Sequence, residues 1–165
     1  MFTNQASTTS AQRVAIILNG SGDWDEWIEV VRTKALGNDI WEFVNPATAK
    51  AELPTLAEPS IPTAADINPA KALDKLSEDE KEQLRLLRYD YKRRITSYDR
   101  QKAAIGSLRS FIQETVSRTY LIYTFRCESP YDMLVALKQR IAPTDQARET
   151  ELINNYSKLK KAPKA

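Results

Sequence analysis

Helical periodicity runs almost without interruption through the second half of the chain, from Asp99 to Lys161. Three patterns of apolar residues at three- and four-residue steps follow one another there, which is typical of helices that bury one face. A fourth pattern precedes them and begins with Ser77 and Glu80, the spacing of a capping box. The sequence therefore predicts an all-α protein, a compact bundle of about five to six helices with a Pro-rich strap or linker.

The pattern that begins at Ser77 and the first of the three patterns after Asp99 follow each other without a clear stop. As one helix, residues 78–124 would be about 70 Å long at roughly 1.5 Å per residue, whereas a compact chain of this size has a radius of gyration of about 15 Å. We therefore expect a break near Thr96–Gln101, with Gly106 as second choice, and a further helix over about Arg100–Tyr123. The apolar end of that helix, Tyr120 to Phe125, is expected to be buried or in an interface.

Other helix ends are marked by capping residues. Asp23 with Glu26 predicts a capped start, and Gly37 predicts the C-terminal end of the same helix. Ser129 followed by proline predicts another start. Thr144 is expected to cap the last helix, whose apolar residues (Ala147, Leu152, Ile153, Tyr156 and Leu159) are expected to face inward.

Composition divides the chain into one domain with short tails. Residues 1–12 are small and polar and are expected to be disordered, and 161–165 form a basic tail. Between them, 13–160 is expected to be a single helical domain, with a Pro-rich linker over 46–72. The β-branched run that opens the domain is expected to lie extended against the helices. Pro59 to Pro62 also fits a PxxP ligand, a short and common motif.

Apolar residues at helical spacing supply the candidate core. All three tryptophans lie within 18 residues, and their spacing favours burial over an aromatic ligand surface. The candidate core or assembly residues are Trp24, Trp27, Trp41, Leu108, Ile112, Leu134, Leu137 and Leu152.

The sequence offers little for catalysis. Histidine is absent and Cys127 is the only cysteine, so imidazole chemistry, most zinc sites and an intrachain disulfide are excluded. Asp23, Asp25, Glu26 and Glu29 can be considered as paired carboxylates, but two of them suit the N-terminus of a helix. We expect no enzyme, no cofactor, no metal site and no small-molecule substrate. Cys127 is expected to be a buried structural thiol, with a crosslink between copies as the alternative.

Charge is unevenly distributed along the chain. Residues 1–76 carry six Lys/Arg against ten Asp/Glu, and residues 77–165 carry eighteen against twelve. This asymmetry indicates either an anionic partner or contact between the two parts. The candidate nucleic-acid-binding residues are Lys158, Lys160, Lys161 and Lys164, with a second basic group at Lys92, Arg93 and Arg94. The alternative is that both groups are simply solvated.

The stretch from Asp99 onward resembles the core of the Gag polypeptide of copia-type LTR retrotransposons. The matching residues are Asp99, Ala103, Ala104, Ile105, Ser107, Leu108, Ser129, Leu134, Leu137, Arg148, Leu152, Leu159 and Lys160. The N-terminal part is similar to the family pattern too, through Leu18–Gly20, Trp24 and Trp27, and Trp41–Val44. The sequence of residues 24–46 most resembles fungal members of the family.

Two departures from the family pattern stand out. The family has a tryptophan just before the central aspartate, where this chain has Ile95–Tyr98. The Cys/His zinc knuckle found later in such polypeptides has no counterpart here.

The resemblance implies a retroviral-type capsid N-terminal domain whose copies assemble into virus-like particles around element RNA in the cytoplasm. It implies a homo-oligomer, RNA binding in the full-length Gag, and no membrane partner; no stretch reaches the roughly 20 apolar residues of a membrane span. The alternative is a nucleic-acid-binding or protein-interaction helical module derived from a domesticated Gag.

Overall fold

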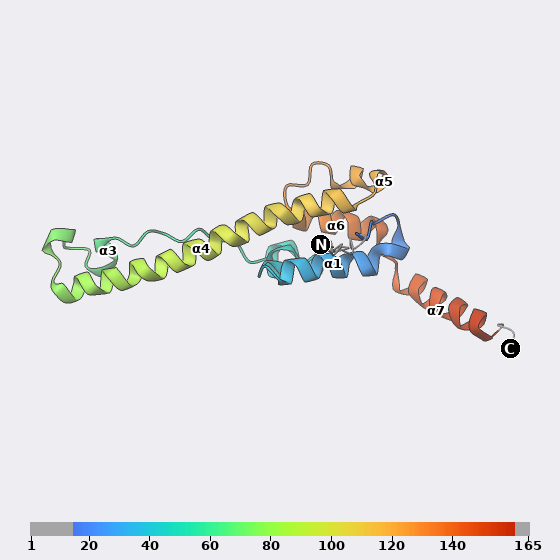
Figure 1. The fold of residues 1–165 in the computed structure, drawn as a ribbon, viewed down its shortest axis with the longest axis horizontal. Coiled ribbons are helices and arrows are strands. Elements are labelled where there is room, and N and C mark those ends of the chain that lie inside the picture. Colours follow the sequence, from blue (N-terminus) through green and yellow to red (C-terminus); the bar gives the residue numbers. More distant parts are fainter. Residues whose placement is uncertain (1–14, 161–165) are drawn as a thin grey trace, which may run out of the picture.

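The computed structural model describes residues 15–160, and this part of the chain is all-α, as the sequence predicts (Figure 1). The predicted tails at 1–12 and 161–165 lie outside the described residues. The longer helices are α1 (Trp24–Leu36), α4 (Glu78–Thr115), α6 (Pro130–Ile141) and α7 (Asp145–Lys160). The short helices are η1 (Ser21–Asp23), α2 (Trp41–Val44), η2 (Lys50–Glu52), α3 (Ala64–Ile67), η3 (Leu73–Lys75), α5 (Arg118–Leu121) and η4 (Ile122–Thr124).

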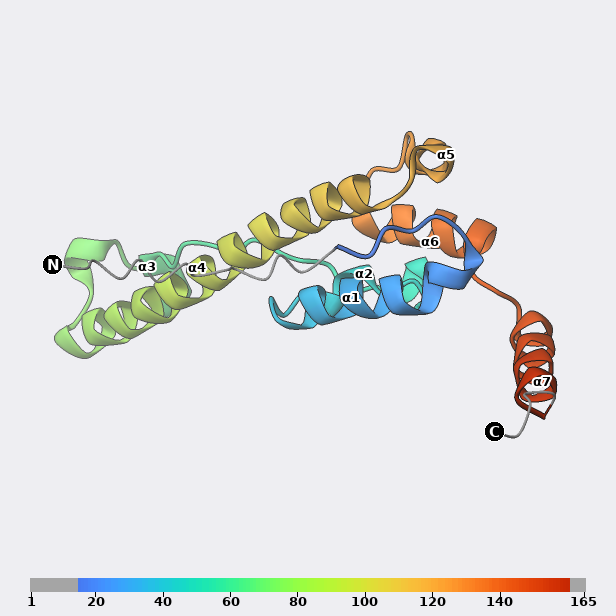
Figure 2. The same ribbon diagram turned by 45° about the vertical axis from the view of Figure 1, so that its right-hand side comes forward.

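The core lies where α1, α6 and the C-terminal half of α4 come together (Figure 2). Each of these helices repeats its apolar residues at three- and four-residue steps, so one face of each points to the same interior. The largest fully buried side chains are Trp27, Leu18, Ile40, Ile112, Met133, Leu134, Leu137, Val31 and Val44. We refer to this part of the molecule as the body.

The chain leaves the helix after Thr115 and pairs with the N-terminal segment. Leu18 N donates to Thr115 O at 2.8 Å, and Ser117 N donates to Leu18 O at 3.1 Å. Inside the core, Trp27 Nε1 donates to Thr115 Oγ1 at 3.0 Å. The β-branched N-terminal segment therefore lies against the helices through this pairing, as predicted for its described part, 15–18.

The predicted break in the long helix is wrong, because α4 runs unbroken for 38 residues, about 57 Å at 1.5 Å per residue. At the expected break, Thr96 donates its hydroxyl back to the Lys92 carbonyl at 2.9 Å, a bond that a helix accommodates. Gly106 also lies within the helix. The helix ends at Val116 instead, and α5 and η4 replace the expected continuation to Tyr123.

The N-terminal half of α4 extends away from the body as an arm, and the Pro-rich segment runs along it (Figure 1). We call residues 46–77 the strap. Pro62, Leu76 and Leu84 are buried where the strap covers the arm. The arm is therefore not an isolated helix in water, which explains why the compactness argument failed. Burial of Pro62 also removes part of the PxxP surface from a ligand.

Side chains cap three helices as the sequence predicts. Ser77 and Glu80 form both bonds of a capping box at the start of α4. Ser129 accepts the backbone N–H of α6's third residue at 3.2 Å, and Thr144 does the same for α7 at 3.2 Å.

One of the two predicted ends of α1 needs correction, the side-chain cap at its start. Asp23 does not cap α1 with its side chain, because its carboxylate accepts the backbone N–H of Asn19 at 2.9 Å. At the other end, α1 stops directly before Gly37, as predicted; Gly37 has a right-handed φ of −63°, and the left-handed residue of this turn is Asp39 with φ 56°. The glycine therefore marks the helix end correctly, and the left-handed residue follows two positions later.

Replacing Thr115 with valine tests the buried bond at the end of α4. Thr115→Val keeps the shape but leaves the Trp27 indole N–H without its acceptor, so the free energy of unfolding should fall by about 1–3 kcal/mol. Urea denaturation measures the change. Thr96→Val is the matched control, because Thr96 makes the same backbone bond from an exposed helical position and should change stability by less than about 0.5 kcal/mol. Equal losses of unfolding free energy in both variants would contradict a stabilising role for the bond between Trp27 and Thr115.

Candidate functional site

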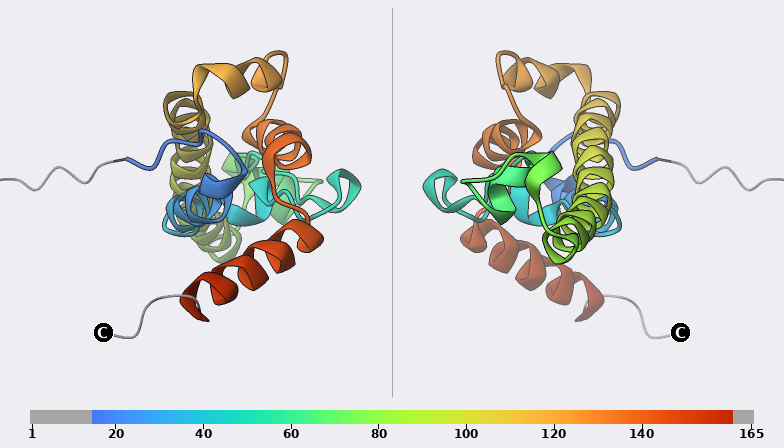
Figure 3. Two further views of the ribbon diagram at one scale, coloured as in Figure 1. Left: turned by 90° about the vertical axis from the view of Figure 1, so that its right-hand side faces the viewer. Right: turned by 90° about the vertical axis from the view of Figure 1, so that its left-hand side faces the viewer.

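Helix α7 carries an apolar surface that no part of the described chain covers. Leu152, Ile153, Tyr156 and Leu159 are 70%, 58%, 61% and 75% exposed. The expectation that these residues face inward is therefore wrong. The physical reason is the direction of α7, which leaves the body and projects away from it (Figures 1 and 3). The first turns of α7 are attached to α1 by an ion pair between Arg148 and Asp25 at 2.6 Å.

A second apolar surface lies at the corner formed by α5 and η4. Ile122 is 60% exposed and Phe125 is 64% exposed. The corner is held against α4, because the guanidinium of Arg109 donates to the carbonyls of Cys127 and Glu128 at 2.9 and 2.7 Å. The sequence led us to expect this apolar end to be buried or in an interface. The prediction of burial within the chain is wrong for Ile122 and Phe125, and the alternative, that they lie in an interface, stays a prediction.

The arm carries a basic stripe. Lys81, Arg85, Arg88 and Lys92 recur at steps of four, three and four residues, and they line a shallow groove together with Leu73, Leu84 and Tyr89. Tyr89 is 75% exposed. Arg85 and Lys81 pair with carboxylates one turn away, whereas Arg88 and Lys92 make no ion pair within residues 15–160. Cations beside an exposed aromatic ring are typical of single-stranded nucleic-acid grooves.

The structure separates the basic residues that the sequence groups together. Arg93 and Arg94 both pair with Asp90, at 2.9 and 2.8 Å, whereas Lys92 joins the stripe. Neighbouring residues on a helix point in different directions, so a run of three cations is not one patch. Sequence reasoning missed Lys81, Arg85 and Arg88, although their helical spacing was visible.

The C-terminal lysines fall at the far end of α7. Lys158 and Lys160 occupy its last turn, and Lys160 Nζ lies 4.7 Å from the centre of the Tyr156 ring. Lys161 and Lys164 lie outside the described residues. The structure thus places two of the four lysines, and it separates them from the stripe on the arm by the whole body (Figure 2).

The remaining sequence candidates divide by burial. Trp24, Trp27, Leu108, Ile112, Leu134 and Leu137 lie in the core, each at most 4% exposed. Trp41 is half-buried against the core, and Leu152 is exposed on α7. The tryptophans therefore contribute to packing: the rings of Trp24 and Trp27 lie 5.8 Å apart between their centres and are tilted by 41° to each other.

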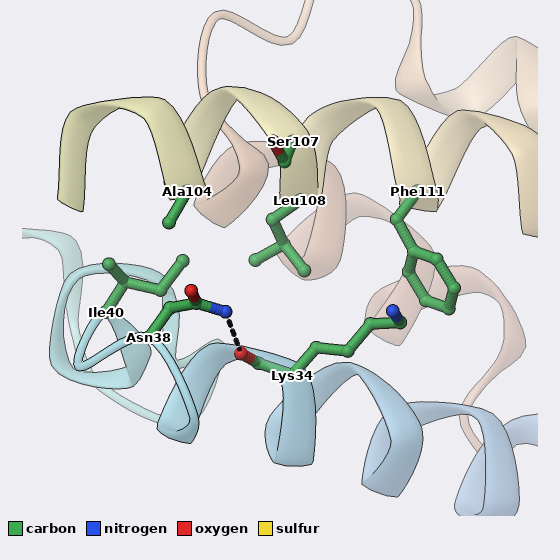
Figure 4. A pocket seen from close by; sticks show the side chains of 7 residues that line it. All are labelled: Lys34, Asn38, Ile40, Ala104, Ser107, Leu108 and Phe111. Atoms are coloured by element: carbon green, nitrogen blue, oxygen red, sulfur yellow. Dashed lines mark hydrogen bonds between the residues drawn. The ribbon is translucent and has the colours of Figure 1, made fainter. Parts of the chain in front are cut away.

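A small hollow lies between α1 and α4 (Figure 4). Its volume is about 140 Å³, below the roughly 300 Å³ at which ligand pockets begin. Lys34 reaches over the Phe111 ring at 4.6 Å, and Asn38 donates to the Lys34 carbonyl at 2.9 Å. These polar groups have partners within the protein, so the hollow offers packing space and no reactive group.

Three of the four carboxylates considered for catalysis make a structural contact. Asp23 holds the Asn19 backbone, Asp25 pairs with Arg148, and Glu29 pairs with Arg32 at 3.5 Å. Within residues 15–160, no cluster of three Cys, Asp or Glu side chains is arranged to hold a metal. Asp25, Glu26 and Glu29 line one hollow along α1, and this hollow is open to solvent rather than enclosed.

Cys127 is half-buried beside the α5–η4 corner. Burial raises the pKa of its thiol above the ordinary value, with a smaller contribution from Asp132. Its Sγ lies 3.7 Å from the Tyr123 carbonyl. A protonated, half-buried thiol is a weak nucleophile, which favours the structural interpretation over a crosslink.

A charged contact holds the junction between strap and arm. Glu80 accepts from Asn68 at 2.9 Å, from the Ser77 backbone at 2.7 Å and from Lys71 at 3.0 Å. These bonds, led by the one from Asn68, lower the pKa of Glu80 to about 2. One carboxylate thus caps α4 and holds the strap at the same time.

Among residues 15–160, no helix has both the length and the apolar character needed to cross a bilayer. The sequence matches no family model, and neither the curated proteins nor the solved structures contain a match. The surfaces described above are therefore the observations from which function is argued.

Acid should release the strap through Glu80. The folded pKa of about 2 lies below the ordinary 4.5, so the stabilisation by Glu80 is full above 4.5 and is lost as pH falls from about 4.5 to about 2. The difference in unfolding free energy between wild type and Glu80→Gln should shrink over that range in urea denaturation. Glu78→Gln, an exposed carboxylate of the same helix turn, controls for helix-dipole effects. A difference independent of pH would contradict this assignment.

Proposed function

We propose that this chain is a structural protein of the Gag type, whose copies assemble into virus-like particles that enclose retrotransposon RNA in the cytoplasm. The observation that carries the proposal is the pair of uncovered apolar surfaces on α7 and on the α5–η4 corner. Leu159 and Phe125, one from each, are 75% and 64% exposed. Exposed apolar surfaces of this kind mark protein–protein contacts.

The placement of the two surfaces supports assembly beyond a dimer. They lie on opposite sides of the body (Figure 3). A closed shell requires each copy to contact several neighbours through different faces, and one face alone gives only a pair. The sequence resemblance to copia-type Gag points in the same direction, through the residues quoted above.

The second candidate function is nucleic-acid binding, as in a helical module derived from a domesticated Gag. It is favoured by the basic stripe on the arm, where Lys81, Arg85, Arg88 and Lys92 follow one face of α4 beside Tyr89. The arm stands clear of the body, so an extended strand can follow it without a clash (Figure 1). The two functions are compatible, because the stripe and the apolar surfaces are separate.

Assembly should depend on the α5–η4 corner. Ile122→Glu together with Phe125→Glu places charges in a contact that excludes water, so the concentration needed for assembly should rise by about tenfold or more. Sedimentation velocity over a concentration series, with electron microscopy, measures this. Ile61→Glu is the control, because Ile61 is 66% exposed but isolated on the strap. Wild-type protein that stays monomeric at every concentration would overturn the proposed function.

RNA binding should depend on the stripe and on salt. Neutralising Lys81, Arg85, Arg88 and Lys92 to glutamine should reduce the slope of log affinity against log salt by about 3 for single-stranded RNA. Neutralising Lys158, Lys160, Lys161 and Lys164 removes the same charge from the other candidate site, so the pair of variants decides between the two sites. Fluorescence anisotropy at several salt concentrations gives the slopes. An affinity indifferent to salt would rule out both.

A further inference from the structure

Helix α7 is a 16-residue helix whose side chains are almost all exposed. An isolated helix of this length is only marginally stable in water, because helices of about 12–15 residues barely offset the cost of nucleation. Among the described residues, the only ion pair that joins it to another helix is Arg148 to Asp25 of α1. A helix that is apolar on one side and lacks a cover on that side needs a partner to be stable.

The apolar residues of α7 form a narrow stripe. Leu152, Tyr156 and Leu159 are separated by four and three residues, and Ile153 lies at the edge of the stripe. This is the spacing of a seam between two helices that pack along their length. Thr150 and Ser157 lie on the opposite face and donate to carbonyls of their own helix.

Apart from Arg148, which pairs with Asp25 of α1, the charges of α7 are sorted by end. Its acidic residues are in the first half, Asp145, Glu149 and Glu151, and its lysines are in the last turn, Lys158 and Lys160. Glu149 and Lys160 are eleven residues apart, about three full turns, so they flank the stripe on the same side. In a parallel pair of such helices, like charges would face each other. In an antiparallel pair, each glutamate meets the lysine of the other helix.

We propose that α7 pairs antiparallel with α7 of a second copy of this chain, with the Leu152–Leu159 stripe at the centre and Glu149 beside Lys160 of the other copy. The inference rests on the proposed function and specifies one of its contacts. The occupant is a second copy because the helix is complementary to itself: each copy supplies both the acidic end and the basic end. A two-fold pair of this kind uses the same surface on both copies.

The size of the contact fits a weak, reversible pair. Four side chains bury about 400 Å² per copy, half of the roughly 800 Å² of a standard interface. The pair alone is therefore too small for a permanent dimer. Combined with the α5–η4 surface on the other side of the body, it links copies in more than one direction (Figure 3).

The first test removes the stripe in the full-length chain. Leu152→Asp with Leu159→Asp should weaken self-association about 100-fold, measured by sedimentation velocity. Thr150→Asp with Ser157→Asp makes the same charge change on the opposite face and should leave the association constant within about threefold. Unchanged tryptophan fluorescence, from Trp24, Trp27 and Trp41 of the body, confirms that the body stays folded. Equal loss in both variants would overturn the proposal.

The second test reads the direction of the pair. Glu149→Lys and Lys160→Glu each place like charges together twice, so each variant alone should associate about tenfold more weakly. An equal mixture of the two variants should recover wild-type affinity, because each mixed pair contains opposite charges. Suppose that association is lost when the stripe is substituted but does not recover when the two charge variants are mixed. Then α7 docks on the body or on the α5–η4 corner of another copy, and the antiparallel pair is overturned.

The outcomes separate this inference from the function it rests on. If the wild-type protein never self-associates, both the α7 pair and the proposed assembly function are refuted. Wild-type assembly that survives Leu152→Asp with Leu159→Asp removes the α7 pair alone and leaves assembly to the α5–η4 corner. Assembly that stops at small oligomers in this variant, while the opposite-face control forms large ones, is the expected result.

Discussion

The body is organised around the point where α4 ends. The hydroxyl of Thr115 accepts a hydrogen bond from the indole N–H of Trp27, and the Thr115 carbonyl accepts one from the backbone N–H of Leu18. These two bonds join α1, α4 and the N-terminal segment inside the core, where an unpaired polar group is costly. The direction of the α5–η4 corner follows from this junction, because the chain turns out of the helix immediately afterwards. One of the two apolar surfaces thus depends on a buried hydrogen bond.

The other constraint is the length of α4. A helix of 38 residues cannot be covered by a body of this size, so part of it must be stabilised by something else. The strap provides this along the arm, and Glu80 fixes the junction by serving as helix cap and as acceptor for Asn68 and Lys71. The arm therefore presents a fixed basic stripe at a distance from the core. A nucleic-acid strand bound there does not compete with the contacts of the body.

Much of the fold could be predicted from local patterns, and the failures were global. The all-α class and the caps at Ser77, Ser129 and Thr144 follow from spacing within a few residues. The continuous α4 did not, because the cover for the arm comes from a Pro-rich segment whose path no periodicity reports. Leu152 was assigned inward because apolar spacing shows that a face needs burial without showing what buries it. The stripe at Lys81 and Arg88 was missed because cations were grouped by adjacency.

The proposed interaction surfaces all lie outside the core, and this has a consequence for the proposed assembly. Each apolar surface exposes only a few large side chains, so each contact is weak by itself. Weak contacts suit a closed shell, because misplaced copies can dissociate and rebind, while many simultaneous contacts make the finished assembly stable. Since none of these side chains takes part in the core around Trp27, the strength of assembly can change by substitution without loss of the fold. A chain with separate residues for folding and for contact is suited to building a structure from copies of itself.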